Sequence, residues 1–525
     1  METHMILRKQ LVILVSLLAF TLQSQGQRIF YSDIEKDDYR QTNFEILGRV
    51  GSNISVYKNM RNRNDVSIYD NEMKLINKVR LDFLPDKIIN ADFIVYPNSY
   101  WMIYQHQKKN AVYCTAVHLD GNGKVIKGPV DLDTSQVGGF GDNKIYTTVW
   151  SDDEQQVMVF KINRRDERRL NFTLLRFNGK DADLRLAEKN ELSLASSERD
   201  RESVFTEFII DNDGDFVFGK MGRAGSREYI NRLDVYVKRP GQDTFISRNL
   251  PLNDKTLDEV KIKADNVNKR FIFNSFFYQQ KRGNIDGIVN LVFDKKEQKI
   301  SAVGTVVFND TMRLDARSEN APIKQAFNDY FIKQVIPKRD GGFAVLAELY
   351  YTSSRQSQSG WNRWDYLYGY NYFNPNALMY YTPYSGIGPR WMDPWNRWGN
   401  NLGNTMVRHY AENVVIMSFN KDAQLEWSNF VRKTQFDDNS DIFLSYNIFF
   451  TGREVRFLFN TLERRELLLN SVTVNAEGVM KRDPTMKSMD RNYEFMPKFG
   501  KQVGANTVVL PTMYKNFICF AKVDF

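Results

Sequence analysis

Residues 66–76 read VSIYDNEMKLI, which is an alternating apolar strand, a turn that opens on Asp70 and a second strand. Residues 117–126 repeat this arrangement as VHLDGNGKVI, with a turn that opens on Asp120. Alternating apolar residues are typical of strands, and an Asp side chain bonds readily to the backbone of a tight turn. Both segments therefore predict β-hairpins, and their likeness indicates a repeated unit.

The same hairpin recurs along the whole chain. Successive turn openers are 50, 58, 60, 56, 126 and 55 residues apart, so one interval is out of line. The seven turn openers are Asp70, Asp120, Asn178, Lys238, Asp294, Asn420 and Asn475, and all except Lys238 are Asp or Asn. A regular period of this length indicates a ring or a stack of similar units.

A second, more apolar hairpin precedes each of these, with outgoing strands such as ISVY at 54–57 and WMIY at 101–104. Seven complete four-strand units result, and an eighth ends after its third strand, at 517–525. An incomplete last sheet would leave open edges, which a strand near residues 28–31 would close. The sequence predicts an all-β fold: an eight-bladed β-propeller closed by its N- and C-terminal strands. The alternative is seven blades, with the eighth unit merged into the first.

The long interval is caused by an insertion, residues 352–409, in the sixth unit. Loops of this length are generally functional, and Trp, Tyr and Arg dominate the hot spots of protein interfaces. Five of the eight Trp lie here, within two matching WNRW tetrads at 361–364 and 395–398 and at position 391. The candidate partner-binding residues are Trp361, Arg363, Trp364, Tyr368, Tyr370, Tyr380, Tyr381, Tyr384, Trp391, Trp395, Arg397 and Trp398. Three interpretations stay open: a cap that packs on itself, a protein-binding surface, and a platform for sugar rings.

The first residues have the pattern of a Sec signal peptide. Arg8 and Lys9 precede an apolar run at 11–20, and Ser24 and Gly26 suit a cleavage site. The apolar run is shorter than the roughly 20 residues that span a bilayer. We therefore expect a signal peptide at 1–26, an exported propeller at 27–525, and no direct membrane span after the signal is removed.

Composition excludes other classes of protein. The 72 Lys and Arg and 64 Asp and Glu are interleaved, without the basic stripe of a nucleic-acid-binding protein. Cys114 and Cys519 lie in strand-like apolar runs, so we expect buried free thiols rather than a disulfide scaffold.

The sequence holds no pattern of catalytic or cofactor chemistry. His106, His118 and His409 are too scattered for a metal site, and the acidic residues at 211–215 fit a turn better than a calcium loop. Nucleophile elbows, Walker loops and Cys-x-x-Cys pairs are absent from the sequence. We therefore expect a non-enzymatic protein without catalytic residues, cofactor or metal. Propeller glycosidases gather channel carboxylates from several blades, a pattern that local spacing does not reveal.

Four short segments carry a resemblance to a known group of proteins: FEILGRV at 44–50, ISVY at 54–57, IYD at 68–70 and QLEWS at 424–428. They resemble poorly characterised exported β-propeller proteins of gliding and type 9-secreting Gram-negative bacteria. The resemblance implies a periplasmic, outer-membrane-associated plug or accessory subunit of the type 9 translocon.

The expected function is accordingly a non-enzymatic binding or scaffold subunit of an outer-membrane transport or secretion complex. Its expected partner is an outer-membrane barrel or secretion-complex protein. The alternative function is that of a glycan-binding or glycan-hydrolysing secreted propeller.

Overall fold

The computed structural model describes residues 27–36, 42–60, 63–137, 144–166, 169–195, 204–223, 230–280, 283–318, 321–354, 363, 380–381, 407–438, 440–463, 466–486 and 493–525. Helices with described bounds are few and short. They are α2 (Asp310–Ala316) and the 3-10 turns η1 (Lys180–Ala182), η3 (Ile323–Gln325) and η6 (Pro497–Phe499). Antiparallel strands make up most of the remaining described residues, as the repeat predicts.

Three sheets follow one another in the first part of the chain. The β2–β5 sheet contains β2 (Thr42–Val50), β3 (Asn53–Met60), β4 (Arg63–Tyr69) and β5 (Leu75–Arg80). The β6–β9 sheet contains β6 (Asn90–Val95), β7 (Ser99–Lys108), β8 (Ala111–Asp120) and β9 (Val125–Gln136). The β10–β13 sheet contains β10 (Thr147–Trp150), β11 (Gln156–Asp166), β12 (Arg169–Asn178) and β13 (Arg185–Ala195), with β25 (Tyr380–Tyr381) also paired to β11.

A nine-stranded sheet forms the middle of the chain. Its first strands are β14 (Val204–Phe205), β15 (Ile209–Ile210), β16 (Phe216–Arg223), β17 (Ile230–Lys238) and β18 (Ile246–Asn249). Its later strands are β19 (Thr256–Asp265), β20 (Arg270–Tyr278), β21 (Gly287–Asp294) and β22 (Lys299–Val307). Within the described residues, β17 and β19 pair at a single ladder position, Ile230–Leu257, so these two groups of strands are joined only there.

Three further sheets complete the described chain. The β23–β27 sheet contains β23 (Tyr330–Pro337), β24 (Phe343–Ser354), β26 (Val407–Phe419) and β27 (Leu425–Val431), with β28 (Gln435–Asp438) paired to β26. The β29–β32 sheet contains β29 (Tyr446–Phe450), β30 (Glu454–Glu463), β31 (Glu466–Asn475) and β32 (Met480–Arg482). The closing sheet contains β33 (Tyr493–Phe495), β34 (Lys501–Gly504), β35 (Thr507–Tyr514), β36 (Phe517–Asp524) and β1 (Arg28–Tyr31).

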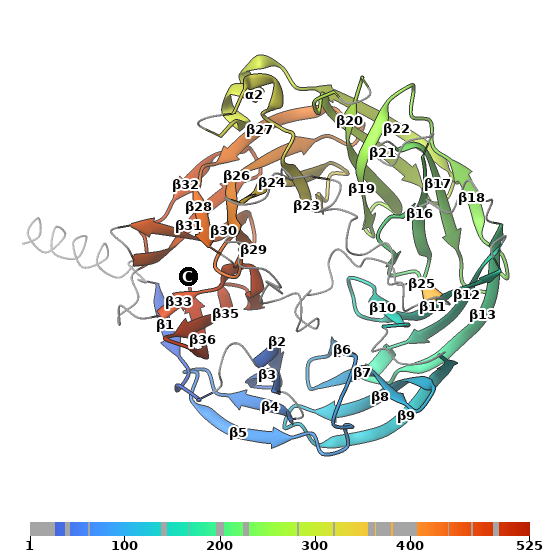
Figure 1. Cartoon of the computed structure of the whole chain (residues 1–525), viewed down its shortest axis with the longest axis vertical. Coiled ribbons are helices and arrows are strands. Elements are labelled where there is room, and N and C mark those ends of the chain that lie inside the picture. Colours follow the sequence, from blue (N-terminus) through green and yellow to red (C-terminus); the bar gives the residue numbers. More distant parts are fainter. Residues whose placement is uncertain are drawn as a thin grey trace, which may run out of the picture.

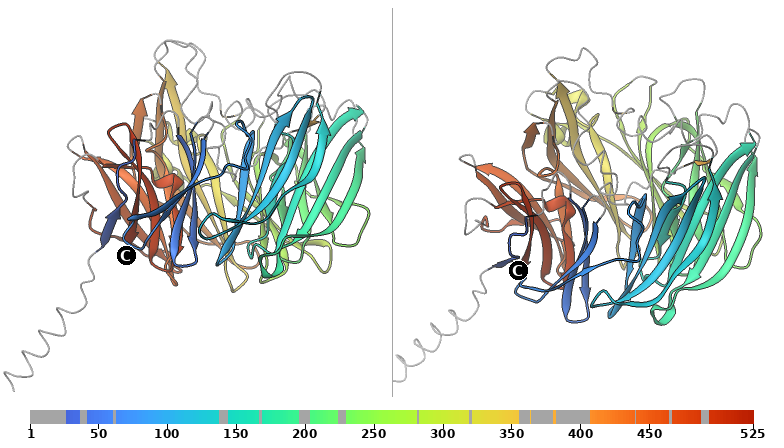
Figure 2. Two further views of the ribbon diagram at one scale, coloured as in Figure 1. Left: turned by 90° about the horizontal axis from the view of Figure 1, so that it is seen from below. Right: turned by 60° about the horizontal axis from the view of Figure 1, so that its bottom comes forward.

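The sheets stand side by side around a central axis, and the chain makes one circuit of the ring (Figure 1). The first strand of a sheet lies near the axis, as with β2 and β6, and the last strand lies at the outer rim, as with β5 and β9 (Figure 1). Seen from the side, the strands cross the ring from one face to the other (Figure 2). This arrangement confirms the predicted all-β propeller fold.

Turn chemistry defines one face of the ring, which we call the hairpin face. There the Asp70 carboxylate accepts hydrogen bonds from the backbone N–H groups of Glu72 and Lys74, at 2.8 and 2.9 Å. Asn420 closes its turn in the same way. The opposite face carries the connections from second to third strands and from sheet to sheet, and we call it the crossover face.

The core lies between neighbouring sheets. One cluster packs Tyr57 of β3 with Phe93 of β6 and Tyr100 of β7, and another packs Phe172 of β12 with Phe218 of β16. Because the middle strands are covered on both sides, they have continuous apolar runs. The outer strands face solvent and are polar, and every residue of β5 is at least partly exposed.

A polar residue, buried in seven cases and partly buried at Lys161, follows the apolar run of each second strand. Those in β3, β7, β11, β16, β20, β24, β30 and β35 are Lys58, Gln105, Lys161, Lys220, Asn274, Glu348, Asn460 and Thr512. Gln105 Nε2 donates to the Tyr146 carbonyl at 2.7 Å, and Asn460 Nδ2 donates to the Phe495 carbonyl at 2.7 Å. These two contacts join adjacent sheets, so the polar position helps to fix how the sheets dock.

Ring closure follows the sequence prediction. Strand β1 pairs antiparallel with β36 in a register that runs from Arg28–Asp524 to Tyr31–Ala521. The N-terminal strand therefore supplies the outermost strand of the closing sheet, beside the C-terminal strand (Figure 1).

The insertion is slightly shorter than the predicted 352–409. Strands β24 and β26 stay paired as far as Ser354 and Val407, so three residues at each end of that range belong to the sheet. The connection itself spans 355–406.

The prediction about the two cysteines has a clear outcome. Cys114 and Cys519 are buried, as expected, and they do not form a disulfide with each other. Among the residues that the structure describes, no helix has the length and apolar character to cross a membrane.

Candidate functional site

Arg363 fixes the start of the insertion to the ring. Its Nε and Nη2 atoms donate to Asp258 Oδ2 at 2.9 and 2.6 Å, and its Nη1 donates to the Asn328 carbonyl at 3.2 Å. The hydroxyl of Tyr278 donates to the other Asp258 oxygen at 2.9 Å. Asp258 is fully buried and Arg363 is 7% exposed, so the ion pair lies inside the protein.

Aromatic rings complete this contact. The Arg363 guanidinium carbon lies 4.0 Å from the centroid of the Phe331 ring and 5.9 Å from that of Phe276. Burial lowers the pKa of Arg363, but the Asp258 carboxylate more than compensates, and the net shift is upward. Asp258 belongs to β19 and Phe331 to β23, so the guanidinium joins two adjacent sheets. We call Arg363, Asp258, Tyr278 and Phe331 the insertion anchor.

A second contact ties the insertion to a distant sheet. Tyr380 and Tyr381 form β25, which pairs antiparallel with Asn163 and Ile162 of β11. Strand β10 pairs with β11 only as far as Phe160, so β25 continues the inner edge where β10 stops. The insertion thus leaves the β23–β27 sheet and reaches the β10–β13 sheet, away from β24 and β26 (Figure 1).

These contacts place three of the twelve candidate partner-binding residues: Arg363, Tyr380 and Tyr381. Arg363 is an internal anchor rather than an exposed contact, because its guanidinium is already bound within the chain. The other nine lie outside the described residues; they are Trp361, Trp364, Tyr368, Tyr370, Tyr384, Trp391, Trp395, Arg397 and Trp398.

Aromatic side chains also gather where the insertion meets the sheet. Tyr351 stacks on Tyr410 with ring centroids 4.5 Å apart and 8° between the planes, and its hydroxyl donates to Glu412 at 3.2 Å. Arg408 lies 4.8 Å above the ring of Phe436, which is 45% exposed. The described root of the insertion is therefore an aromatic surface with an arginine on it, as at many protein interfaces.

Two carboxyl groups on neighbouring inner strands form a second candidate site. They are Glu45 of β2 and Asp92 of β6, both partly buried. Burial raises the pKa of Glu45 to about 8, with Lys501 opposing this shift and Asp92 adding to it. Burial also raises the pKa of Asp92, against the influence of Lys144 and Thr148. A pair of coupled carboxyls can hold a proton near neutral pH, which general acid–base chemistry requires.

Two further buried carboxylates are neutralised within the ring: Glu259 of β19, and Glu207, which lies between β14 and β15. Lys261 Nζ lies 2.5 Å from Glu207 Oε1 and 3.1 Å from Glu259 Oε1. Glu259 also accepts a hydrogen bond from the backbone N–H of Ile332 at 3.2 Å. These two carboxylates share the Lys261 ammonium, whereas Asp92 accepts a hydrogen bond from Asn90 Nδ2 at 3.1 Å.

The acidic residues at 211–215 form a turn, as predicted. Asp211 Oδ1 accepts hydrogen bonds from the backbone N–H groups of Asp213 and Asp215, at 3.0 and 2.9 Å. The Lys295 ammonium pairs with all three carboxylates, including Asp213 at 2.8 Å and Asp215 at 3.0 Å. The place where a cation would sit is thus occupied by a side chain of the protein.

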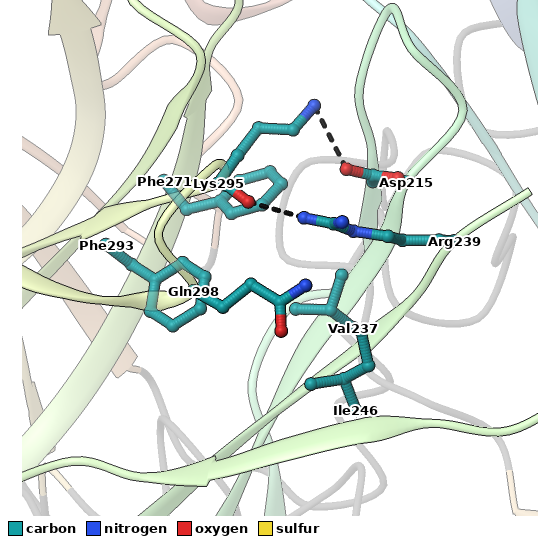
Figure 3. Close-up of a pocket in the computed structure, with 8 residues that line it drawn as sticks. All are labelled: Asp215, Val237, Arg239, Ile246, Phe271, Phe293, Lys295 and Gln298. Atoms are coloured by element: carbon teal, nitrogen blue, oxygen red, sulfur yellow. Dashed lines mark hydrogen bonds and ion pairs between the residues drawn. The ribbon is translucent and has the colours of Figure 1, made fainter.

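A small pocket adjoins Lys295. Figure 3 shows Lys295 pointing to Asp215, and Arg239 donating to the Lys295 carbonyl oxygen. Its other lining residues are Val237, Ile246, Phe271, Phe293 and Gln298. The space holds no more than about one water molecule, so it is not a ligand site.

The histidines do not form a metal site within the described residues, where no cluster of three candidate ligands occurs. His118 stacks on Trp101 with centroids 4.7 Å apart and bonds to the Ser99 hydroxyl at 2.9 Å. His409 bonds to the Tyr350 hydroxyl at 2.8 Å. Both side chains are thus held by contacts within the chain.

Sequence reasoning located the insertion but not its contacts with the ring. Asp258 and Arg363 are 105 residues apart, and Ile162 is farther still from Tyr381. The buried carboxyl groups of the inner strands were missed as well, because each stands alone in its own strand. Aligning the inner strands would have shown that several carry an acidic residue.

No protein-family model matches the chain, and no curated protein matches it in sequence. Three solved structures are similar in fold. The WD40 domain of SCAP from fission yeast is 9% identical with a TM-score of 0.37, over 96% of this chain and 98% of that one. A prolyl endopeptidase is 9% identical with a TM-score of 0.40, over 92% of this chain and 56% of the endopeptidase. An ulvan lyase is 10% identical with a TM-score of 0.36, over 82% of this chain and 90% of the lyase.

Proposed function

We propose that this protein is a non-enzymatic binding or scaffold subunit, a plug or accessory protein, of an outer-membrane transport or secretion complex. In this proposal the signal peptide exports the chain to the periplasm, where it associates with the outer membrane through a barrel or secretion-complex protein. The resemblance to exported propellers of type 9-secreting bacteria supports this assignment by analogy.

The observation that carries the proposal is the attachment of the aromatic insertion at two separate points. The buried Arg363–Asp258 pair fixes one point, and the pairing of β25 with β11 fixes the other. A segment tethered in this way loses less conformational freedom on binding than a free loop. Tethering therefore favours a recognition surface, and part of the segment can cap the ring at the same time.

We further propose that the ring has eight blades. Eight hydrophobic clusters of the described residues each join two neighbouring four-stranded units, including one between the β17 and β19 halves of the nine-stranded sheet. The polar position of the second strands also occurs eight times, buried in seven of them and partly buried at Lys161. Because β17 and β19 share one ladder position, we interpret the nine-stranded sheet as two blades.

Affinity capture from solubilised outer membranes tests the function. The unaltered protein should recover an integral barrel protein, and a variant with residues 355–406 replaced by a short Gly-Ser linker should lose it while staying folded. Trp361→Ala and Trp395→Ala should each weaken binding by about 2 kcal/mol if they are hot spots. Trp150→Ala is the matched control, because Trp150 is 37% exposed and lies on β10. Equal capture by the linker variant and the unaltered protein would rule out the insertion as the docking surface.

The Glu45–Asp92 pair supports a second candidate, a glycan-hydrolysing propeller. Glycosidases use two carboxyl groups, one protonated and one ionised, and the raised pKa of Glu45 fits the protonated role. A screen of polysaccharides tests it with Glu45→Gln and Asp92→Asn. Loss of a measured hydrolysis in both variants, with unchanged folding, would favour the enzyme. Absence of any hydrolysis by the unaltered protein would count against the enzyme and leave the binding function as the proposal.

A further inference from the structure

The first described residues form an arm that lies on the closing sheet. We call residues 27–36 the closing arm; they contain β1 and the segment that follows it. Beyond the four paired residues of β1, the Ser32 N–H donates to the Phe520 carbonyl at 2.8 Å. The Phe520 N–H in turn donates to the Ser32 hydroxyl at 3.0 Å. The arm is thus held by backbone pairing and by one buried hydroxyl group.

Near the end of the closing arm, the Glu35 carboxylate lies between two lysines of the β2–β5 sheet, Lys58 and Lys78. Its Oε1 lies 2.7 Å from Lys58 Nζ and accepts a hydrogen bond from the Tyr69 hydroxyl at 3.2 Å, and its Oε2 pairs with Lys78. Lys58 is almost fully buried, with 1% of its side chain exposed. A buried ammonium group requires a carboxylate partner, so this position selects an acidic residue.

Apolar contacts complete the arm's binding surface. Ile29 and Tyr31 pack against a core cluster that contains Leu510 and Val523, and the Tyr31 ring lies 4.4 Å from the ring of Tyr493. Phe30 faces the opposite side, where Lys522 lies 4.6 Å from its ring centroid. The binding surface of the closing arm therefore recognises an extended segment with apolar side chains, followed by a serine and, three residues later, a glutamate.

The closing arm has fewer buried contacts than the strands inside the ring. Strand β1 covers four of the eight residues of β36, and among the described strands it pairs with β36 alone. None of its four side chains is fully buried. Elements with few buried contacts open before the rest of a domain, so the arm should detach while the ring stays folded.

We propose that the groove which holds the closing arm is an exchangeable strand-binding site, and that the arm of a second copy of this chain is the occupant it takes in trans. An open groove exposes the edge of β36 and separates the Glu35 carboxylate from Lys58. A second arm restores both because it has the same sequence, and two copies can exchange arms symmetrically.

Cross-linking of full-length chains tests the exchange. One copy carries Arg28→Cys and the other carries Asp524→Cys; these residues are paired partners at the end of the β1–β36 ladder. Paired residues of antiparallel strands lie about 4.5–5.5 Å apart, which a disulfide can span. Under mild oxidation at high protein concentration, this mixture should form a disulfide-linked pair of chains. The matched control replaces Asp524→Cys with Val303→Cys, at an exposed position on β22.

In-register pairing raises the local concentration of the two thiols, so the yield should exceed the control by about tenfold or more. A yield equal to that of the control overturns the proposal. If a cysteine variant does not fold, isotopically light and heavy copies of the unaltered protein are concentrated together instead and analysed by native mass spectrometry. Dimers of mixed mass that dissociate when a peptide of residues 27–36 is added in excess support the exchange. A purely monomeric protein overturns it.

Discussion

Lys433 Nζ lies 2.8 Å from Glu348 Oε1, and neither side chain has any exposed surface. Ser445 donates a hydrogen bond to the other Glu348 oxygen at 2.6 Å, and Lys433 also donates to the Ala411 carbonyl at 2.9 Å. Burial lowers the pKa of Lys433, and the Glu348 carboxylate opposes that shift. Because both side chains are buried away from water, the charge of each residue is stabilised by the charge of the other.

Breaking this pair should therefore be costly. Lys433→Met leaves the Glu348 carboxylate buried, and we expect the free energy of unfolding to fall by about 3–5 kcal/mol. Chemical denaturation of the purified protein measures the change. Lys74→Met is the control, because Lys74 pairs with Glu72 at an exposed site and exposed pairs contribute about 0–1 kcal/mol. A loss for Lys433→Met as small as that of the control would show that the buried pair is dispensable.

The insertion anchor gives a second prediction. Arg363→Met removes the cation from the fully buried Asp258, so we expect a loss of about 3–5 kcal/mol and faster proteolysis within 355–406. In the double variant with Asp258→Asn, part of that stability should return, because the uncompensated charge is gone. Arg408→Met is the matched control, since its partner Asp438 is 38% exposed. Additive losses in the double variant would contradict a direct coupling of Arg363 and Asp258.

The stability of the ring should depend on pH through Glu35. Burial tends to raise the pKa of Glu35, but Lys58 and Lys78 lower it from its ordinary value of 4.5 to about 2. A carboxyl with a lowered folded-state pKa stabilises the protein above its unfolded-state pKa, and this contribution disappears as the pH falls from 4.5 toward 2. The unaltered protein should therefore exceed Glu35→Gln in stability at pH 7, and the difference should shrink in that acidic range. Unfolding curves at several pH values measure it, and a difference that does not change with pH would refute the role of Glu35.

Glu45 should act in the opposite direction. Because burial raises its pKa to about 8, folding favours the protonated form, and ionisation at higher pH works against the folded state. The contribution of Glu45 is complete below pH 4.5 and declines as the pH rises from there to about 8. Glu45→Gln keeps the neutral form at every pH and should flatten this decline in unfolding experiments between pH 5 and 9. A parallel decline in both proteins would mean that Glu45 is ionised in the fold.

The elements that sequence predicted are those set by local chemistry. Asp70 and Asn420 open tight turns because their side chains bond to backbone N–H groups two and four residues later, a pattern visible in the chain itself. The closing strand was predictable for a different reason. A count of strands left one sheet incomplete, and residues 28–31 supplied the missing strand.

The contacts of the candidate sites were not predictable in the same way. Arg363 reaches Asp258 because two sheets dock side by side and leave a buried carboxylate between them. The coupling of Glu45 with Asp92 likewise depends on the distance between two inner strands, which neither strand encodes alone. Such contacts belong to the geometry of the ring, and the sequence period of the repeat carries no information about them.

The pairing of β1 with β36 also has a kinetic consequence. Residues 28–31 must wait for residues 521–524, at the other end of the chain, before they can pair. Contacts between such distant residues form slowly, because the entropy of closing a long loop has to be overcome first. During synthesis the hairpins can form in order, while the incomplete ring stays open and its unpaired strand edges are exposed to aggregation. We therefore expect the last refolding phase to be the joining of the two chain ends, and chaperone demand to be greatest just before it.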